Sequence, residues 1–448
     1  MKTPTPTPTP TKTPNTLRRR ALTGAAIAAT AALTLAGCSG GSGADSGAGA
    51  DEGGSITVWS WEPTLDQVVA DFEEEYPNVE VDLVNVGTGP DHYTALQNAI
   101  AAGDGVPDVA QLEYFALPQF RLADSISDLT EFGADELDGT YTAGPWSSVQ
   151  SDGGVYGLPM DSGPMAMFYN EEVFDRLGVD VPTTWDDYLE AARELHAADP
   201  DVYIANDNGD PGLTTSALWQ AGSTPYSVDG TSVSIDFSQE GTTRYVDLWQ
   251  QLIDEELLAP ISLWTDEWYQ GLGDGTIATL NYGAWMPANF SSAVEAGSGA
   301  WRVAPTPQWQ EGETNTAENG GSALSVPEAS ENKQLAYDFI EYANAGDGVQ
   351  SRIENGAFPA TVADLESDEF LNIEFEYFGG QKANEIFAES AANVVDGWSY
   401  LPFQAYSNSI FGDTAGQAYV GGATLQEGLD DWAEASASYA EEQGFTVD

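Results

Sequence analysis

Aromatic residues stand beside turn-forming residues at several places outside the regular apolar patterns of this chain. These places are Trp61, Glu113-Tyr114-Phe115, Asn281-Tyr282-Gly283-Ala284-Trp285 and Trp398-Ser399-Tyr400-Leu401-Pro402-Phe403. Flat aromatic faces suit the apolar C–H patch of a sugar ring, while carboxylates and amides can hydrogen-bond to its hydroxyl groups. Each aromatic residue alone is better explained as core, because Trp and Tyr are usually mostly buried. Their joint placement indicates a binding site.

Signals for catalysis are weak by comparison. The chain has no Gly-x-x-x-x-Gly-Lys-Ser/Thr loop and no Gly-x-Ser-x-Gly elbow. Its two histidines, His92 and His196, are predicted at the surface. A glycosidase needs two carboxylates about 5 to 9 Å apart, but 72 Asp and Glu residues supply such pairs by chance. The sequence therefore favours a non-enzyme without cofactor, and leaves a secreted glycosidase or lyase open.

One segment has a superficial likeness to a calcium loop. Residues 206–211, Asn-Asp-Asn-Gly-Asp-Pro, lack the Asp-x-Asp-x-Asp-Gly spacing and the distal Glu of such loops. We interpret the segment as a solvated turn, and we predict no metal site.

The N-terminus has the three parts of a secretory signal. Leu17-Arg18-Arg19-Arg20 is the positive region, and the apolar stretch from Ala21 to Ala36 is shorter than the ~20 residues that span a bilayer. Leu35-Ala36-Gly37-Cys38 resembles the lipobox of bacterial lipoproteins, which implies cleavage before Cys38 and a lipid on its thiol. The alternative is a soluble secreted protein with an incidental cysteine. General or twin-arginine export both remain open.

Composition limits the remaining classes. Cys38 is the only cysteine, which excludes a disulfide framework and multi-cysteine metal sites. After Cys38 there are eight Lys and Arg against 72 Asp and Glu, a net charge of −64, so nucleic acid is excluded as a partner. The charge suggests a salty habitat, or else an acidic secreted protein from an ordinary one. Residues 38–54, rich in Gly, Ser and Asp, are predicted to be a flexible linker.

The pattern from Ser55 onward is strand, helix, strand. Residues 56–60 and 79–83 alternate as strands, and a helix with one apolar face lies between them. A second helix is expected to end at Gly103, and a third strand covers residues 108–112. Further along, residues 165–170 read as a buried strand, Thr184 and Asp187 as a capping box, and residues 425–442 as a helix. This is an open α/β pattern, too long for one ordinary core.

Several motifs occur in the order found in a known family. They are Leu158-Pro159, Phe168-Tyr169-Asn170, Pro182-Thr183-Thr184-Trp185-Asp186-Asp187, Gly271 to Trp285, and Gly320-Gly321-Ser322-Ala323-Leu324 before Lys333 to Tyr342. From Ser55 to the C-terminus the chain thus resembles the extracellular sugar-binding proteins of ABC importers.

The resemblance implies a two-lobe fold of the periplasmic-binding-protein type, class II. Lobe 1 would comprise residues 55–162 and 325–366, and lobe 2 residues 163–324 and 367–448, after a signal peptide at 1–37. The crossings between lobes are expected near residues 161–164, 323–327 and 358–364. A sugar would bind between the lobes, and the expected ligand-binding residues are Trp61, Glu113, Tyr114, Asp161, Trp219, Tyr282, Trp285, Gly321 and Trp398.

The resemblance also implies partners and a location. A monomer anchored through Cys38 at the outer face of the cytoplasmic membrane would deliver a mono- or oligosaccharide to a permease driven by an ATPase. The chain has Glu62-Pro63 where maltodextrin binders carry an Asp-Lys pair, so maltose specificity is not implied. A receptor of the same fold for a polyamine or another cation remains the alternative.

Overall fold

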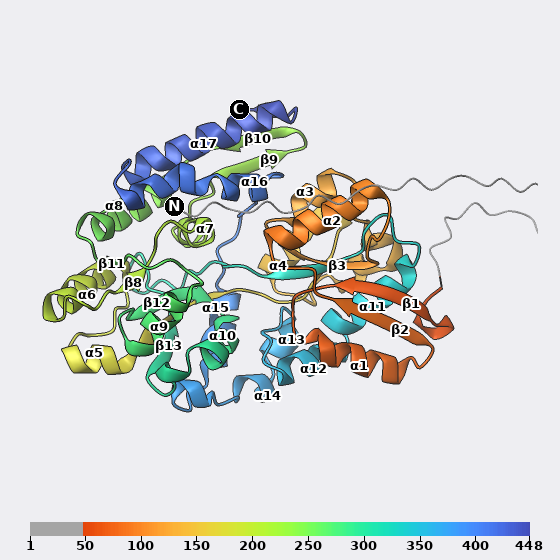
Figure 1. Cartoon of the computed structure of the whole chain (residues 1–448), viewed down its shortest axis with the longest axis horizontal. Coiled ribbons are helices and arrows are strands. Elements are labelled where there is room, and N and C mark those ends of the chain that lie inside the picture. The colour runs from red at the N-terminus through yellow and green to blue at the C-terminus, as the bar shows by residue number, and fades with distance from the viewer. Residues whose placement is uncertain (1–47) are drawn as a thin grey trace, which may run out of the picture. The chain divides into compact units, whose positions relative to one another are not determined.

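The computed structural model describes residues 48–448 (Figure 1). The predicted signal peptide, Cys38 and most of the predicted linker lie outside the described residues. Among the described residues, no helix combines the length and the apolar character that crossing a membrane requires.

The first part of the fold is built on a five-stranded sheet with the order β2-β1-β3-β14-β6. Its strands are β1 (Gly54–Trp59), β2 (Val79–Val84), β3 (Val109–Glu113), β6 (Leu158–Pro159) and β14 (Ser322–Ser325). β1 runs parallel to β2 and β3, whereas β14 is antiparallel to β3 and β6. Because β1 and β3 are parallel, their carboxyl ends meet at the same edge of the sheet.

Helices cover both faces of this sheet, with α1 and α2 on opposite sides (Figure 1). Their bounds are α1 (Leu65–Glu75), α2 (Pro90–Ala102), α3 (Leu117–Leu122), α4 (Ala143–Ser148), α11 (Lys333–Ala345) and α12 (Gly348–Glu354). The predicted apolar face of α1 is confirmed, since Leu65, Val68 and Phe72 are fully buried. α2 ends where predicted, at Gly103, whose left-handed φ of 64° suits glycine.

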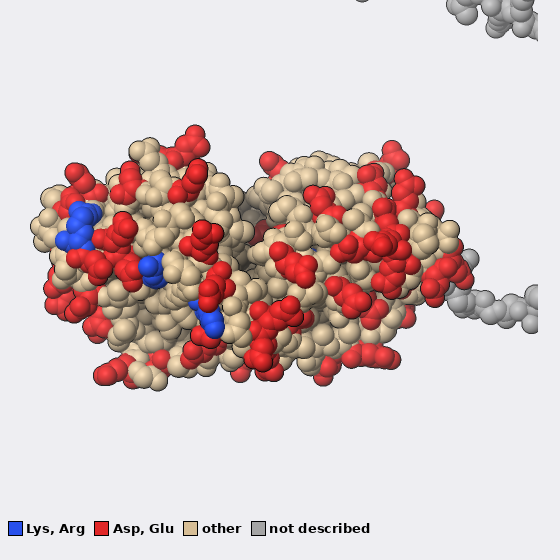
Figure 2. Space-filling model, turned by 90° about the horizontal axis from the view of Figure 1, so that it is seen from below, with Lys and Arg blue, Asp and Glu red and all other residues tan. Residues whose placement is uncertain are grey.

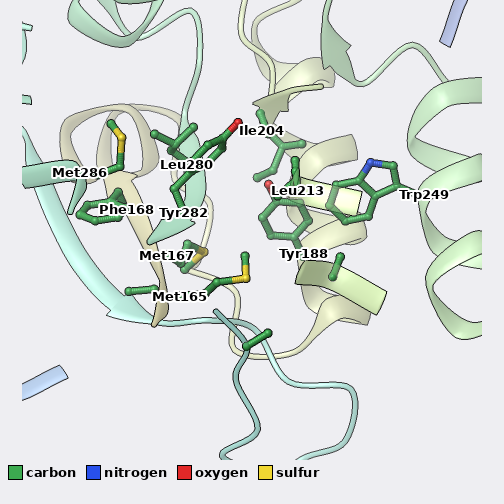
Figure 3. Close-up of a cluster of buried hydrophobic side chains, with 14 of the residues drawn as sticks. Met165, Met167, Phe168, Tyr188, Ile204, Leu213, Trp249, Leu280, Tyr282 and Met286 are labelled. Carbon is green, nitrogen blue, oxygen red and sulfur yellow. The ribbon is translucent and has the colours of Figure 1, made fainter. Parts of the chain in front are cut away.

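The second part is built on the antiparallel sheet β12-β7-β13. Its strands are β7 (Met165–Asn170), β12 (Thr279–Gly283) and β13 (Trp301–Pro305). The central strand β7 is buried on both faces, which explains its continuous apolar sequence. Figure 3 shows Met167 and Phe168 of β7 pointing to different sides within this core. Phe168 packs against Phe290, with ring centroids 5.3 Å apart.

Ten helices and several short strands surround that sheet among the described residues. The helices are α5 (Glu171–Leu177), α6 (Trp185–Ala198), α7 (Pro211–Gln220), α8 (Glu240–Asp254), α9 (Asp266–Asp274), α10 (Met286–Ala293), α14 (Asp368–Leu371), α15 (Ala383–Ala392), α16 (Gln404–Ser409) and α17 (Leu425–Glu442). The short strands form two small sheets, β15 (Thr446–Val447) with β10 (Ser232–Ile235) and β9 (Tyr226–Asp229), and β11 (Leu258–Ala259) with β8 (Ala205–Asn206). The predicted capping box at the start of α6 is present, because Thr184 and Asp187 exchange both hydrogen bonds.

The remaining elements are short. They are the hairpin β4 (Gln150–Ser151) with β5 (Gly154–Val155), α13 (Val362–Leu365), and the 3₁₀ helices η1 (Ala50–Glu52), η2 (Leu129–Phe132), η3 (Ala134–Leu137), η4 (Glu295–Gly297), η5 (Glu376–Phe378), η6 (Phe411–Asp413) and η7 (Ala415–Val420).

Two hydrophobic cores lie in the described part of the chain, one for each of the main sheets. The chain passes between the two sheets at residues 160–164, 306–321 and 355–367. The first two of these crossing segments pair with each other, since Asn319 N–H donates to the Gly163 carbonyl at 2.7 Å. The crossing predicted at residues 323–327 is wrong, because residues 322–325 form β14 of the first sheet. The lobe ranges stay a prediction, with the boundary after residue 324 falling inside that strand.

The predicted linker also ends earlier than residue 54. Ala50 is buried in the first core, and its N–H donates to the Asp338 carboxylate at 2.7 Å. Gly54 already pairs with Val79 in the sheet. A composition of small and polar residues does not reveal such long-range contacts, so the sequence could not place this boundary.

Candidate ligand-binding cleft

A cleft runs along the crossing segments and has two adjoining halves. The first half has a volume of ≈ 470 Å³ and the second ≈ 290 Å³. Both are lined by Glu113, Trp285, Gly320 and Gly321, so these residues stand where the halves meet. Each half falls near the range of about 300–1,000 Å³ that is typical of small-molecule sites.

The carboxyl ends of β1 and β3 form one wall of the first half. Trp61 follows β1, and its N–H donates to Gln111 Oε1 at 3.1 Å. The same oxygen accepts from Ser60 at 2.6 Å, while Gln111 Nε2 donates to Ser322 Oγ at 3.0 Å. The buried amide of Gln111 therefore fixes the aromatic loop after β1 against β14.

Two carboxyl groups face the first half. Asp161 Oδ1 accepts from the N–H and the hydroxyl of Ser322, at 2.6 and 3.1 Å. Glu113 Oε2 accepts from the Tyr93 hydroxyl at 2.6 Å. Burial raises the pKa of Glu113 to about 7 and that of Asp161 to about 6. Near neutral pH Glu113 is therefore partly protonated and can donate to a ligand hydroxyl, whereas Asp161 is mostly ionised and accepts hydrogen bonds.

Trp285 forms the opposite wall, and a hydrogen bond from its indole holds the side chain in place. Its Nε1 donates to the Asn319 carbonyl in the crossing segment at 2.7 Å. Gly283 permits this close approach, because a Cβ there would lie 2.4 Å from the indole nitrogen. Gly321 is required for a similar reason: its φ is +93°, and a Cβ would lie 2.6 Å from the Tyr114 ring.

More aromatic side chains surround the second half. Trp264 stacks near Trp285 with ring centroids 5.9 Å apart, and Tyr282 meets both tryptophans edge-on. Trp264 is 45% exposed and has a left-handed φ of 61°, which is uncommon for a bulky residue. The Tyr282 hydroxyl is buried and has no hydrogen-bond partner among the described residues. This half therefore offers flat aromatic faces, with one buried hydroxyl group behind them that has no hydrogen-bond partner among the described residues.

Asp210 adds a carboxylate to the second half, at the start of α7. Its Oδ1 accepts from Leu213 N–H at 2.6 Å, which caps the helix. Its neighbour Asp207 is buried and accepts from Trp249 Nε1 and from the Tyr419 hydroxyl, at 2.8 and 2.9 Å. These bonds hold the loop that presents Asp210 to the cleft. No group of His, Cys, Asp and Glu in residues 48–448 is arranged to hold a metal ion.

Comparison with known proteins decides the family. Residues 59–349, more than half of the chain, match the family model described as bacterial extracellular solute-binding protein. The chain belongs to this family. Among solved structures, it is similar to the ABC transporter associated binding protein from B. animalis subsp. lactis Bl-04, in complex with β-1,6-galactobiose. The two share 46% identity with a TM-score of 0.81, over 88% of this chain and 99% of that one.

Two further members of the solute-binding family are more distant. The galacto-N-biose/lacto-N-biose I-binding protein of Bifidobacterium longum is 26% identical, with a TM-score of 0.78 over 88% of this chain and 99% of that one. The arabinooligosaccharide-binding protein of Halalkalibacterium halodurans is 25% identical over 371 residues, covering 79% of this chain and 82% of that protein. These similarities confirm the predicted family and its two-lobe α/β fold. The family consists of binding proteins, and its members are extracellular.

The candidate cleft brings together six of the predicted ligand-binding residues. Those that line it are Trp61, Glu113, Asp161, Tyr282, Trp285 and Gly321. Tyr114 lies behind the wall instead, where its hydroxyl donates to the Asp161 carbonyl at 2.6 Å. Trp219 and Trp398 stack on each other at 5.1 Å and do not line either half. Tyr400, two residues after Trp398, lines the second half.

The predicted surface position of His92 and the predicted solvated turn at residues 206–211 are wrong. His92 is fully buried against Trp61, with ring centroids 4.9 Å apart, and burial lowers its pKa to about 4. His196 is half-buried and contacts the Val202 carbonyl at 3.0 Å. The turn at residues 206–211 is not solvated, because Asn206 and Asp207 are buried beside the cleft. These residues are buried by packing against β11 and α8, which are distant in the sequence, so a local sequence pattern cannot predict their burial.

Sequence reasoning missed several cleft residues. They are Gln111, Asp210, Trp264, Asn319, Phe358 and Tyr400. Asp210-Pro211 was visible as a helix start, and Tyr400 belongs to an aromatic segment that drew attention through Trp398. Trp264 carries no periodic signal at all.

Proposed function

We propose that this protein is the extracellular receptor that captures a short oligosaccharide, of two sugar rings, and delivers it to an ABC permease. The single observation that carries the proposal is the position of Trp285 between two halves of one cleft, each with its own aromatic faces and carboxyl group. One ring would stack in each half. The relatives whose names include β-1,6-galactobiose, lacto-N-biose and arabino-oligosaccharides support a ligand of this class.

Capture would follow from closure of the two lobes about the crossing segments. A ligand shifts that equilibrium only by binding the closed form more tightly than the open form. Aromatic faces on both sides, Trp61 from the first part and Trp285 from the second, would supply that difference. The pore and the ATPase would be other chains.

The proposal includes a lipid anchor on Cys38. The apolar stretch before it and the lipobox-like tetrapeptide support this. Two or more acyl chains would hold the receptor stably beside its permease, whereas one chain binds membranes only marginally.

Calorimetric titration of the purified protein with β-1,6-galactobiose and lacto-N-biose tests the proposal. We expect one of these, or a related disaccharide, to bind and Trp285→Ala to weaken binding by more than ~2 kcal/mol, as a buried anchor would. Trp285→Phe is the matched control, because it keeps a flat ring and should recover part of the affinity. Unchanged affinity in a folded Trp285→Ala protein would contradict the site, and sugar hydrolysis would contradict a pure receptor.

A cation receptor of the same fold is the second candidate. The observation in its favour is that no Lys or Arg lines either half, while Glu62, Glu113, Asp161 and Asp210 do. Titration with putrescine in the same calorimeter separates the two candidates. Binding of putrescine that Trp285→Ala abolishes, together with no response to any disaccharide, would favour the cation.

A further inference from the structure

A second cavity of ≈ 350 Å³ lies away from the ligand-binding cleft. It is lined by residues 181–184, by the segment 304–316 that begins at the end of β13, and by residues 386–393 at the end of α15. It shares no lining residue with either half of the cleft. Nothing in the proposed transport function uses it.

Three oxygen atoms of this cavity are buried without a hydrogen-bond partner among the described residues. They belong to Thr306 (Oγ1), Gln308 (Oε1) and Glu313 (Oε2). Thr306 is only 2% exposed, so its hydroxyl is not in bulk solvent. A buried acceptor without a donor costs about 1–3 kcal/mol, and three beside one cavity are therefore unusual.

The backbone and the hydrogen bonds place these residues in the wall of the cavity. Ala304, Pro305, Thr306 and Gln308, at the end of β13 and just after it, all line the cavity. Gln308 Nε2 donates to the carbonyls of Thr306 and Asn315, at 2.7 and 3.0 Å. Both donor contacts fix the amide orientation, which leaves Oε1 in the wall without a hydrogen-bond partner in the described part of the chain.

The cavity is also preformed. Gln308 N–H donates to the Thr183 carbonyl, and Trp185 N–H donates to the Gln308 carbonyl, both at 3.0 Å. On the other side Thr314 Oγ1 donates to Asn393 Oδ1 at 2.9 Å. A segment held in this way loses little conformational freedom when a ligand binds.

The free atoms define the chemistry of a ligand. Gln308 Oε1 and Glu313 Oε2 only accept hydrogen bonds, and a threonine hydroxyl can accept as well. Glu311 and Glu389 add negative charge, and no Lys or Arg lines the cavity. A primary ammonium group carries three N–H donors and no acceptor, so it matches this set. Apolar side chains of the same wall, including Val181 and Ile386, suit an aliphatic stem.

We propose that this cavity binds a primary ammonium group on a short aliphatic stem, separately from the cleft. Such a group occurs on free alkylamines and on the lysine side chains of proteins. The chemistry is shared by both sources, and the experiment distinguishes them.

The test is calorimetric titration of the folded protein with 1-pentylamine and with neutral 1-pentanol. We expect only the amine to bind. Glu313→Gln, which keeps the shape and removes the charge, should weaken binding about tenfold or more, because hydrogen bonds to charged groups contribute about 1.5–3 kcal/mol. Thr306→Val should weaken it about fivefold, the equivalent of about 1 kcal/mol.

The matched control is Glu434→Gln in α17, an exposed residue that does not line the cavity. It removes the same charge from the chain, so it should leave amine binding unchanged. Melting curves of all variants verify that they are folded.

Three results would overturn the proposal. Equal binding of pentanol would show a merely apolar cavity, and equal weakening by Glu434→Gln would show diffuse attraction to the acidic surface. Loss of amine binding in Trp285→Ala but not in Glu313→Gln would place the amine in the cleft. Titration with Nα-acetyl-lysine methylamide then identifies the source: binding favours a lysine of a partner protein, and binding of pentylamine alone favours a free amine.

Discussion

Glu318 places a carboxyl group where the first two crossing segments meet. The side chain is 3% exposed, and its oxygens accept from Gly163 N–H at 2.6 Å and from the Ser162 hydroxyl at 3.0 Å. Burial, with a smaller contribution from the nearby charge of Asp161, raises the pKa of Glu318 from 4.5 to about 7. We predict that this group makes the folding stability depend on pH, and that Glu318→Gln removes this dependence.

The sign follows from proton binding. Between pH 4.5 and about 7 the folded protein retains a proton on Glu318 that the unfolded chain has released. The contribution is therefore fully present below pH 4.5 and is lost as the pH rises through about 7. One pKa unit corresponds to about 1.4 kcal/mol, so the shift is worth about 3 kcal/mol. A glutamine keeps the shape of the protonated group but cannot titrate.

Urea denaturation at pH 5 and pH 8, at constant ionic strength, measures the effect. Buried Glu113, Asp161 and Asp207 also have raised pKa values, so the wild-type protein carries their dependence too. The difference in slope between wild type and Glu318→Gln isolates Glu318, and any pH-independent loss in the variant cancels. Glu434→Gln is the exposed control. Parallel pH profiles of wild type and Glu318→Gln would refute the reasoning.

Three further predictions concern ligand length, anchoring and salt. Trp264→Ala should weaken the binding of a disaccharide by about 1 kcal/mol, because one aromatic face is lost. The binding of a monosaccharide in the first half should not change. Equal losses of affinity for both sugars, measured by calorimetry, would contradict the two-ring arrangement. Cys38→Ala should release the protein into the medium, and a variant that fractionates with membranes would contradict the lipid anchor. The melting temperature should rise from low to molar NaCl, because self-repulsion of the acidic surface is screened (Figure 2); an unchanged value would reject the salty-habitat hypothesis.

The regular elements were predictable because their signals are local. α1 follows from one apolar face, α6 from the Thr184 capping box, and α17 begins and ends at the predicted residues. The buried strand β7 could be recognised because both of its faces are covered, which gives a continuous apolar run. Such features need only a few neighbouring residues to be read.

The cleft was predictable only in part. Trp61 and Glu113 could be predicted to lie in one site, because parallel strands have their carboxyl ends at the same edge of a sheet. The burial of His92 arises from contact with Trp59 and Trp61, and that of Asp207 from Trp249 and Tyr419, which lies 212 residues away. The sequence pattern of a single helix or strand does not predict contacts between residues so far apart in the sequence. The predicted crossing near residue 325 failed because β14 is short and belongs to the first sheet.

The distribution of the few basic residues bears on what the cleft can accept. Six of the eight that follow Cys38 form ion pairs at the surface, which contribute little to stability. Arg352, by contrast, is buried behind the first half of the cleft, where it donates to the Met160 carbonyl. Its positive charge partly neutralises the negative charges of Glu62 and Asp161.

This internal cation removes part of the attraction that the cleft would exert on an external one. The raised pKa of Glu113, about 7, acts in the same direction, because a protonated carboxyl group carries no charge. A cation in the cleft would lower the pKa of Glu113 and release its proton on binding, and the free energy of that release would weaken cation binding. A neutral ligand with hydroxyl groups has no such cost, because it can accept a hydrogen bond from protonated Glu113 and donate one to Asp161. The electrostatics of the buried groups therefore favour a sugar over a polyamine in the cleft, despite the strongly acidic composition of the chain.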